Sequence, residues 1–180
     1  MDTIKFKVDG YLEGGFPVEE EDIETITELD YYEDLIKFIE NGNEKEASNL
    51  VNQNLEAEFI IENISPFEDE GFECVGVKNL SAAFPYVEET EGGTKIPVFK
   101  YISASFILKG PKEIIKDWMD KEGDKYKFNI ELFQEWMDEN GGDGLQDGCG
   151  YSFGGACYDL NGFGSNACSI DCESIEKAFN

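Results

Sequence analysis

The fold follows from residues 82–108, which read AAFPYVEETEGGTKIPVFKYISASFIL. Two apolar and aromatic segments flank Glu91-Gly92-Gly93-Thr94, and a glycine pair between such segments is typical of a hairpin turn. We predict that residues 82–90 and 96–108 form two antiparallel strands joined by this turn. Residues 102–108 lack charged side chains, as does a strand that is buried on both faces.

Further strands are predicted on either side of this hairpin, because apolar and polar residues alternate there as they do in a half-buried strand. They are residues 3–9, 23–29, 55–61 and, as a shorter segment, 72–77.

Helices are predicted where apolar residues recur at helical spacing. The first helix begins at Asp30, which can form a capping box with Glu33, and it ends at Gly42. Three more are expected: around residues 47–51, from Pro111 in a first turn to near Gly123, and from 129 to 140.

This order of elements predicts an α+β fold, an antiparallel sheet with helices packed on one side. The last 40 residues differ in composition, since they hold nine of the 19 glycines and four of the five cysteines. We therefore expect an α+β domain at 1–140 and a Gly/Cys-rich loop appendage at 141–180, packed on the same domain.

The charge excludes large classes of function. The chain has 40 Asp and Glu residues against 14 lysines, a net charge of −26, and it contains neither histidine nor arginine. There is no imidazole for a Ser–His or Cys–His pair and no guanidinium clamp for phosphate. Such a surface repels DNA and RNA, so direct nucleic-acid binding is not expected.

The location expected from the sequence is a cytoplasm. No stretch approaches the roughly 18 apolar residues of a membrane span, and the first residues do not form a secretory signal. An anionic surface is also repelled by anionic lipids, so no membrane partner is expected.

The negative charge is concentrated in residues 13–44, which hold twelve carboxylates and one lysine. Residues 95–127 carry eight lysines and should form the less negative side. We expect a partner-binding acidic face made of eight residues: Glu19, Glu20, Glu21, Asp22, Glu24, Asp30, Glu33 and Asp34.

The magnitude of the charge suggests mimicry of a nucleic acid. Small domains usually carry a net charge of magnitude about 2–8. On B-form DNA, 26 charges occupy roughly 44 Å of duplex, and a compact 180-residue globule is about 40 Å across. A folded chain of this kind could therefore occupy the groove of a DNA- or RNA-binding protein. The alternative is a solvated surface that serves solubility alone.

In composition and size the chain resembles the small acidic inhibitors that phages and mobile elements use against restriction and CRISPR nucleases. The resemblance implies a non-enzymatic inhibitor without a cofactor, acting in the bacterial host cytoplasm on a basic nucleic-acid-binding nuclease. It is carried by composition, size and missing signals, and by no sequence motif.

Metal-dependent binding is a second hypothesis. Cys149, Cys157, Cys168 and Cys172 could together hold zinc, but their spacing lacks the paired CxxC of such sites, and free thiols are favoured. Residues 143–148 and 159–162 resemble calcium loops, although the position of the final EF-hand glutamate is Ile170. We expect no metal.

The sequence is also compatible with two further hypotheses. A carboxylate-based hydrolase is a third hypothesis, although among 40 carboxylates some pair satisfies any spacing by accident. Tyr151, Phe153, Tyr158 and Phe163 lie in a glycine-rich segment, where they could anchor an interface or cover the sheet.

Overall fold

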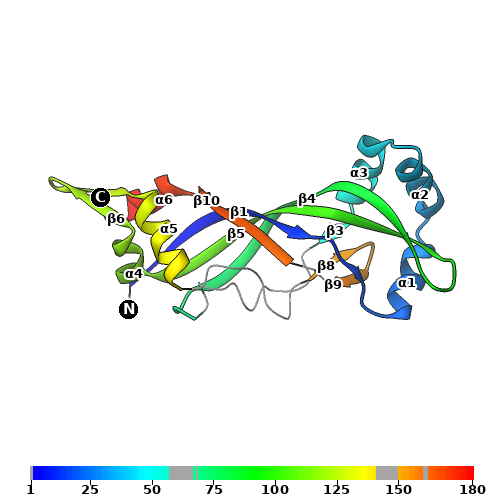
Figure 1. Ribbon diagram of the computed structural model, residues 1–180, viewed down its shortest axis with the longest axis horizontal. Coiled ribbons are helices and arrows are strands. Elements are labelled where there is room, and N and C mark those ends of the chain that lie inside the picture. Colours follow the sequence, from blue (N-terminus) through cyan, green and yellow to red (C-terminus); the bar gives the residue numbers. More distant parts are fainter. Residues whose placement is uncertain (1, 57–66, 68, 141–149, 160–161) are drawn as a thin grey trace.

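A computed structural model of the chain, drawn in Figure 1, has an α+β fold. It describes residues 2–56, 67, 69–140, 150–159 and 162–180, and at positions 12, 13, 84 and 162–168 it describes the backbone alone. The strands are β1 (Thr3–Glu13), β2 (Phe16–Pro17), β3 (Leu55–Glu56), β4 (Glu73–Glu89), β5 (Lys95–Pro111), β6 (Met119–Glu122), β7 (Lys125–Phe128), β8 (Gly150–Phe153), β9 (Ala156–Asp159) and β10 (Gly162–Ile170). The helices are α1 (Glu20–Thr27), α2 (Tyr32–Glu40), α3 (Glu44–Asn52), α4 (Lys112–Asp117), α5 (Ile130–Glu139) and α6 (Cys172–Phe179).

The predicted central hairpin is confirmed. β4 and β5 pair antiparallel, from Glu89 opposite Lys95 to Glu73 opposite Lys109. The turn between them is closed by a hydrogen bond from the Gly93 N–H to the carbonyl of Thr90 (2.9 Å). β1 pairs with β5, and β10 pairs with β1, which gives an antiparallel sheet of order β10-β1-β5-β4.

Two smaller sheets complete the β-structure. One has the order β2-β9-β8-β3, and the other is the hairpin of β6 and β7. Of the strand predicted at 55–61, only Leu55 and Glu56 are described, as β3, and residues 57–61 lie outside the described residues.

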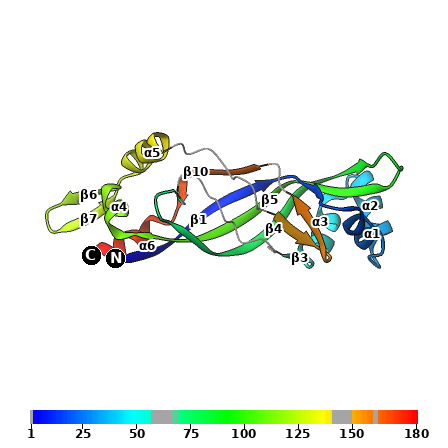
Figure 2. The same ribbon diagram turned by 90° about the horizontal axis from the view of Figure 1, so that it is seen from below.

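The molecule is elongated along the central hairpin, and its helices gather at the two ends (Figures 1 and 2). β4 and β5 have 17 residues each. At a rise of about 3.3 Å per residue, each strand extends over roughly 55 Å. This length exceeds the diameter of about 40 Å expected for a compact globule of the same size. The predicted α+β fold is thus confirmed, with an extended central hairpin and helices that pack near its two ends.

Residues 23–29, for which the sequence predicts a strand, lie mostly in α1, so this prediction is wrong. Ile26 is the buried residue of the helix, with 1% exposure, and Ile23 lies one turn earlier and packs on the same core. The alternation was misleading because apolar residues three apart also fit one face of a helix. Three carboxylates in the first turn favour the helix through its macrodipole.

The helix predicted from Pro111 to Gly123 is shorter than expected. Pro111 is the N-cap of α4 rather than a first-turn residue, and α4 ends at Asp117. Met119 starts the strand β6, which turns at Gly123 (φ +65°) into β7. The helix predicted at 129–140 is confirmed as α5, with the Asn129 side chain accepting from the N–H groups of Glu131 and Leu132.

The C-terminal segment contains strands where the sequence predicted loops. β8 and β9 form a hairpin in the second sheet, and β10 is an edge strand of the first sheet. Tyr151, Phe153 and Tyr158 are fully buried, so they cover the sheets instead of anchoring an interface. The side chain of Phe163 lies outside the described residues.

The core is built around aromatic side chains in both halves of the molecule. One group joins Trp118 to Phe6, Phe72 and Phe133, with ring centroids 4.9 to 5.9 Å apart. Gly110 is needed here, because a Cβ at this position would lie 2.0 Å from the ring of Phe72. The other group places Phe99 against Phe153, Tyr151 and Tyr158.

Candidate acidic interface

The first acidic run, residues 19–22, forms the N-terminus of α1. The backbone of Val18 donates to the carbonyl of Cys157 (3.0 Å), which fixes the approach to the helix. Glu19 is the N-cap in extended conformation, and Asp22 Oδ2 accepts from the Glu19 N–H (3.0 Å). Carboxylates are favoured at this position because the helix N-terminus carries partial positive charge.

The second acidic group, Asp30, Glu33 and Asp34, lies at the start of α2. The predicted capping box of Asp30 and Glu33 is wrong, because α2 begins one residue later, with Tyr31 as N-cap. Glu33 and Asp34 are instead in the first turn, where the macrodipole stabilises them. α2 is held on the central hairpin by the Tyr32 hydroxyl, which donates to the carbonyl of Lys95 (2.7 Å).

The structure places all eight predicted residues at one end of the molecule, on α1, α2 and their approaches (Figure 1). Seven of them are exposed. Asp22 is half-buried, and its Oδ1 accepts from the backbone N–H of Cys157 (2.9 Å). Within the described parts of the chain, none of the eight forms a salt bridge.

We call residues 19–52, which contain α1, α2 and α3, the acidic head. It holds twelve carboxylates and two lysines, a net charge of −10. Glu28, Glu44 and Glu46 are exposed members that the sequence prediction did not include, although the charge count could have found them. Exposed Glu89 and Glu91, at the tip of the β4–β5 hairpin, join the same end only through the tertiary structure (Figures 1 and 2).

The opposite end is less negative than the acidic head. Residues 112–128, from α4 to β7, contain five lysines and five carboxylates, and α5 and α6 at the same end add six carboxylates and one lysine, for a net charge of −5. The less negative side predicted at 95–127 is therefore divided, since β5 spans the length of the molecule and only its continuation forms this end. Lys95 lies beside the acidic head, and its hydrogen bond to Glu40 raises the pKa of this lysine.

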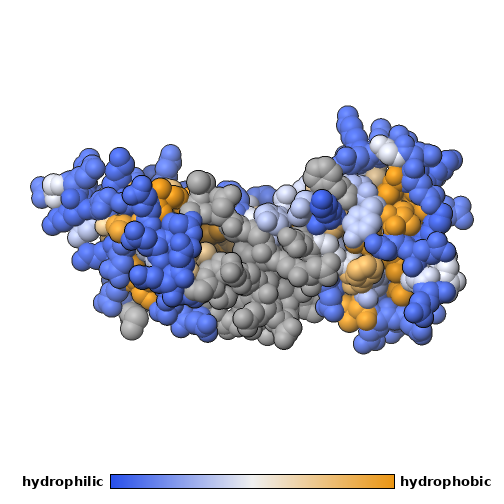
Figure 3. Space-filling view, viewed as in Figure 1, coloured by the Kyte–Doolittle hydropathy of each residue, from blue (hydrophilic) through white to orange (hydrophobic). Residues whose placement is uncertain are grey.

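Apolar side chains are exposed next to the first acidic run. Phe16 and Val18 have 45% and 44% exposure and lie within the three residues before Glu19. β2, which contains Phe16, is an edge strand of its sheet. In the space-filling view, apolar patches show between hydrophilic residues at the end that carries the acidic head (Figure 3).

This chain matches no protein-family model, no curated protein and no solved structure. A function for this chain therefore has to be argued from the residues of the acidic interface.

Of the four cysteines that could together hold zinc, the structure describes the side chains of Cys157 and Cys172, and these two do not converge. Cys157 is on β9, beside α1, whereas Cys172 begins α6, and Figure 1 places these elements in opposite halves. Cys149 and the side chain of Cys168 lie outside the described residues. Among the residues that the structure describes, no three Cys, Asp or Glu side chains are grouped as metal ligands.

The calcium hypothesis falls largely on residues that the structure does not describe. Residues 143–148 and 160–161 belong to these, and Asp159 is an exposed residue at the end of β9. No helix in the described ranges is long and apolar enough to cross a membrane.

Proposed function

We propose that this chain is an acidic protein inhibitor that binds the positively charged nucleic-acid channel of a nuclease through its acidic head. The observation that carries the proposal is the grouping of seven exposed carboxylates at one end of an elongated molecule, where they form no salt bridge with any residue that the structure describes. Lysines and arginines of the partner would pair with these carboxylates and would thereby be withheld from phosphates.

Charge density and shape support the same proposal. The 26 net negative charges correspond to roughly 44 Å of B-form duplex, and the central strands alone extend over roughly 55 Å. The charge per unit length is thus comparable to that of DNA. An elongated body with a dense group of exposed carboxylates at one end suits insertion of that end into a channel (Figure 2).

Phe16 and Val18 would add specificity to the electrostatic attraction. Protein interfaces combine a desolvated apolar centre with a polar rim, and truncation of an anchor mainly raises the dissociation rate. Here the apolar pair lies directly before the first acidic run, so partner contacts would include both. Carboxylates would set the association rate, and the apolar pair would prolong the complex.

The experiment first identifies the target and then tests the face. The protein is immobilised and exposed to bacterial lysate at low salt, with and without excess competitor DNA, and captured proteins are identified by mass spectrometry. A nuclease that DNA displaces is then purified, and cleavage of its substrate is measured with added inhibitor. We expect inhibition that weakens steeply as salt rises, because charge pairing at a surface is screened.

Two variants with the same change in charge distinguish the acidic head from acidity in general. In the head variant, the seven exposed residues are replaced by their amides: Glu19, Glu20, Glu21, Glu24, Asp30, Glu33 and Asp34. In the control variant, seven exposed carboxylates outside the acidic head are replaced in the same way: Asp117, Glu122, Asp124, Glu131, Glu135, Glu139 and Glu173. The proposal requires that only the head variant loses inhibition. Equal inhibition by both variants, or capture of no protein that DNA displaces, would refute it.

A further inference from the structure

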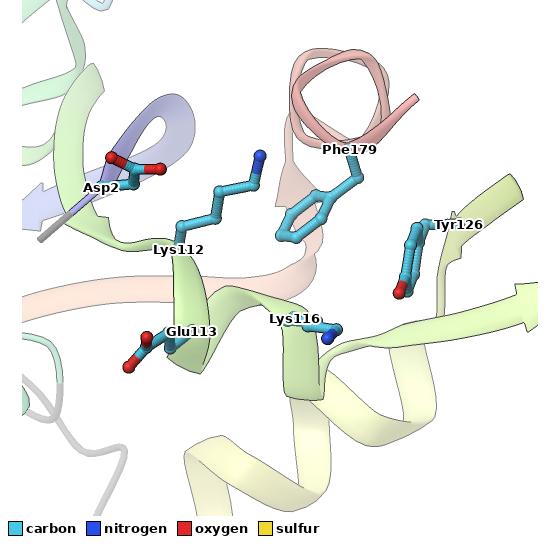
Figure 4. Close-up of a pocket in the computed structure, with 6 residues that line it drawn as sticks. All are labelled: Asp2, Lys112, Glu113, Lys116, Tyr126 and Phe179. Carbon is cyan, nitrogen blue, oxygen red and sulfur yellow. The ribbon is translucent and has the colours of Figure 1, made fainter.

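A pocket of about 500 Å³, drawn in Figure 4, is lined in part by α4 and α6, which Figure 1 places at the end of the molecule opposite the acidic head. Its lining comes from α4, β7, α6 and the residue before β1: Asp2, Lys112, Glu113, Lys116, Tyr126 and Phe179. Its volume is in the range of sites that hold small organic ligands. It shares no residue with the acidic head.

Two lysines line this pocket without a carboxylate partner. Lys112 and Lys116 are four residues apart on α4, so they project from the same face of the helix. Among the described residues neither forms a salt bridge, although Asp2 and Glu113 line the same pocket. In a chain with 40 carboxylates and 14 lysines, two lysines one helical turn apart that form no salt bridge with a described carboxylate are available for an anion.

Aromatic rings supply the rest of the wall. The rings of Tyr126 and Phe179 have centroids 5.6 Å apart at an angle of 48°. Lys112 Nζ lies 4.9 Å from the centroid of Phe179, and Lys116 Nζ lies 5.8 Å from that of Tyr126. Each ammonium group therefore lies beside a flat apolar surface (Figure 4).

The walls are tied to one another by hydrogen bonds. The side chain of Asn180 accepts from the Tyr126 N–H and donates to the Tyr126 carbonyl, both at 2.8 Å. Glu176 Oε1 accepts from the Phe128 N–H (2.9 Å), which also joins α6 to β7. Lys112 Nζ donates to the Ala178 carbonyl (2.9 Å) and keeps two N–H groups for a ligand. The pocket is thus largely preformed.

We propose that this pocket binds a nucleoside monophosphate. A phosphate monoester carries close to two negative charges at neutral pH, which two lysines on one helical face can match. The base would stack on the rings of Tyr126 and Phe179, since every base presents a flat π-face. The carboxylates of Asp2 and Glu113 accept hydrogen bonds and suit the amino and N–H groups of a base.

The charge of the chain favours monophosphates over longer polyphosphates. Among the described residues two lysines line the pocket, so further phosphates would be left unneutralised in a protein of net charge −26.

Titration calorimetry at physiological salt tests the proposal. The probes are the four common ribonucleoside monophosphates, the matching nucleosides and inorganic phosphate. We expect one or more of the monophosphates to bind about tenfold more tightly, or better, than the matching nucleoside and than inorganic phosphate. The nucleoside lacks the phosphate contacts, and inorganic phosphate lacks the contacts of the base. Absence of monophosphate binding, or equal affinity for inorganic phosphate, would overturn the proposal.

Matched variants locate the binding site. Lys112→Gln with Lys116→Gln should weaken monophosphate binding about tenfold or more, since charge-assisted contacts to phosphate are lost. Glutamine keeps a donor for Ala178, and circular dichroism verifies the fold. Lys121→Gln with Lys125→Gln, on the exposed β6–β7 hairpin, makes the same change in charge outside the pocket. Equal weakening by both pairs would show a general charge effect and would refute the site.

Phe179→Leu separates the stacking contact from the phosphate contact. It removes the ring but keeps an apolar side chain, so monophosphate affinity should fall while the affinity for inorganic phosphate stays unchanged. Unchanged monophosphate affinity would contradict the assigned role of the ring.

Discussion

The carboxylate of Asp22 joins α1 to β9, 135 residues away along the chain. Its Oδ1 accepts from the backbone N–H of Cys157 (2.9 Å), and its Oδ2 accepts from the N–H of Glu19 (3.0 Å). One member of the acidic run is therefore occupied in holding the helix to the second sheet. The side chains of its neighbours Glu20 and Glu21 are exposed. Among the described residues, neither carboxylate forms a hydrogen bond that joins α1 to another element.

Replacement of Asp22 should therefore cost stability where replacement of its neighbour does not. We expect Asp22→Ala to lower the free energy of unfolding by about 2 kcal/mol, because two hydrogen bonds to a charged acceptor are lost. Glu21→Ala is the control and should change it by less than about 0.5 kcal/mol. Urea denaturation measures both, and equal values would contradict the structural role of Asp22.

Tyr151 and Tyr158 are two buried tyrosines that differ in the hydrogen bonding of their hydroxyl groups. Their rings stack with centroids 5.0 Å apart, and both are fully buried. The Tyr158 hydroxyl donates to the Pro97 carbonyl (3.0 Å), whereas that of Tyr151 is among the buried polar atoms without a partner in the structure. Burial raises the pKa of both phenols, so both hydroxyls are protonated at neutral pH.

We predict opposite outcomes for the two hydroxyl deletions. Tyr158→Phe should destabilise by about 1–2 kcal/mol, because a buried carbonyl loses its donor. Tyr151→Phe should be neutral or stabilising, since it removes a buried polar group that has no partner. Thermal and urea unfolding of both variants test this, and a larger loss for Tyr151→Phe would show that its hydroxyl has a partner in solution.

Glu28 is at the unfavourable end of α1. It is the exposed C-cap residue, lies four residues after Glu24, and the last turn contains no basic residue. We expect Glu28→Lys to stabilise the protein by about 0.5–1 kcal/mol at low ionic strength, through the macrodipole and the removal of a like-charge pair. The gain should shrink as salt rises.

Glu46→Lys provides the comparison for this prediction. It makes the same change in net charge, but in the first turn of α3, where a carboxylate is favoured. Denaturation midpoints are measured for both variants at low and high salt. The midpoint of Glu28→Lys should be higher than that of Glu46→Lys. Equal stabilisation would mean that only the overall charge matters.

Asp9 makes part of the stability pH-dependent. Hydrogen bonds from Lys7 and from the buried Ser105 hydroxyl (2.6 Å) lower the pKa of the Asp9 carboxyl. A group whose pKa is lower in the folded state stabilises above its unfolded pKa, near 4, and loses that contribution as pH falls through the folded value. Wild type should therefore exceed Asp9→Asn in stability at neutral pH, with a difference that disappears on acidification.

Urea unfolding between neutral and strongly acid pH measures this difference. Asp124→Asn, at the exposed β6–β7 turn, is the control and should show no such trend. A difference between wild type and Asp9→Asn that persists in strong acid would indicate a packing effect instead of the ionised carboxyl.

The sequence could predict elements whose signals are local. The hairpin around Gly92 and Gly93 and the helix capped by Asn129 were both placed correctly, because turn and cap chemistry act within a few residues. Residues 23–29 could not be assigned by the same means. Their spacing fits two periods, and burial of Ile26 against distant strands selected the helix.

Part of the candidate acidic interface could likewise be predicted from local sequence, and part depended on the tertiary structure. The sequence alone identified the acidic residues of α1 and α2, since their proximity along the chain makes them neighbours in any fold. Their exposure, and the use of Asp22 as a structural acceptor, depended on where β9 lies. Neither could be read from the charge pattern.

By itself, the sequence determined the net charge of −26, the absence of histidine and arginine, the antiparallel hairpin and the α+β class. These are properties of composition and of short-range patterns. Only the tertiary structure decided that the molecule is elongated, that α1–α3 and the hairpin tip share one end, and that Lys112 and Tyr126 line one pocket with Phe179. Such relationships join residues far apart in the chain, and long-range packing of the apolar core fixes them.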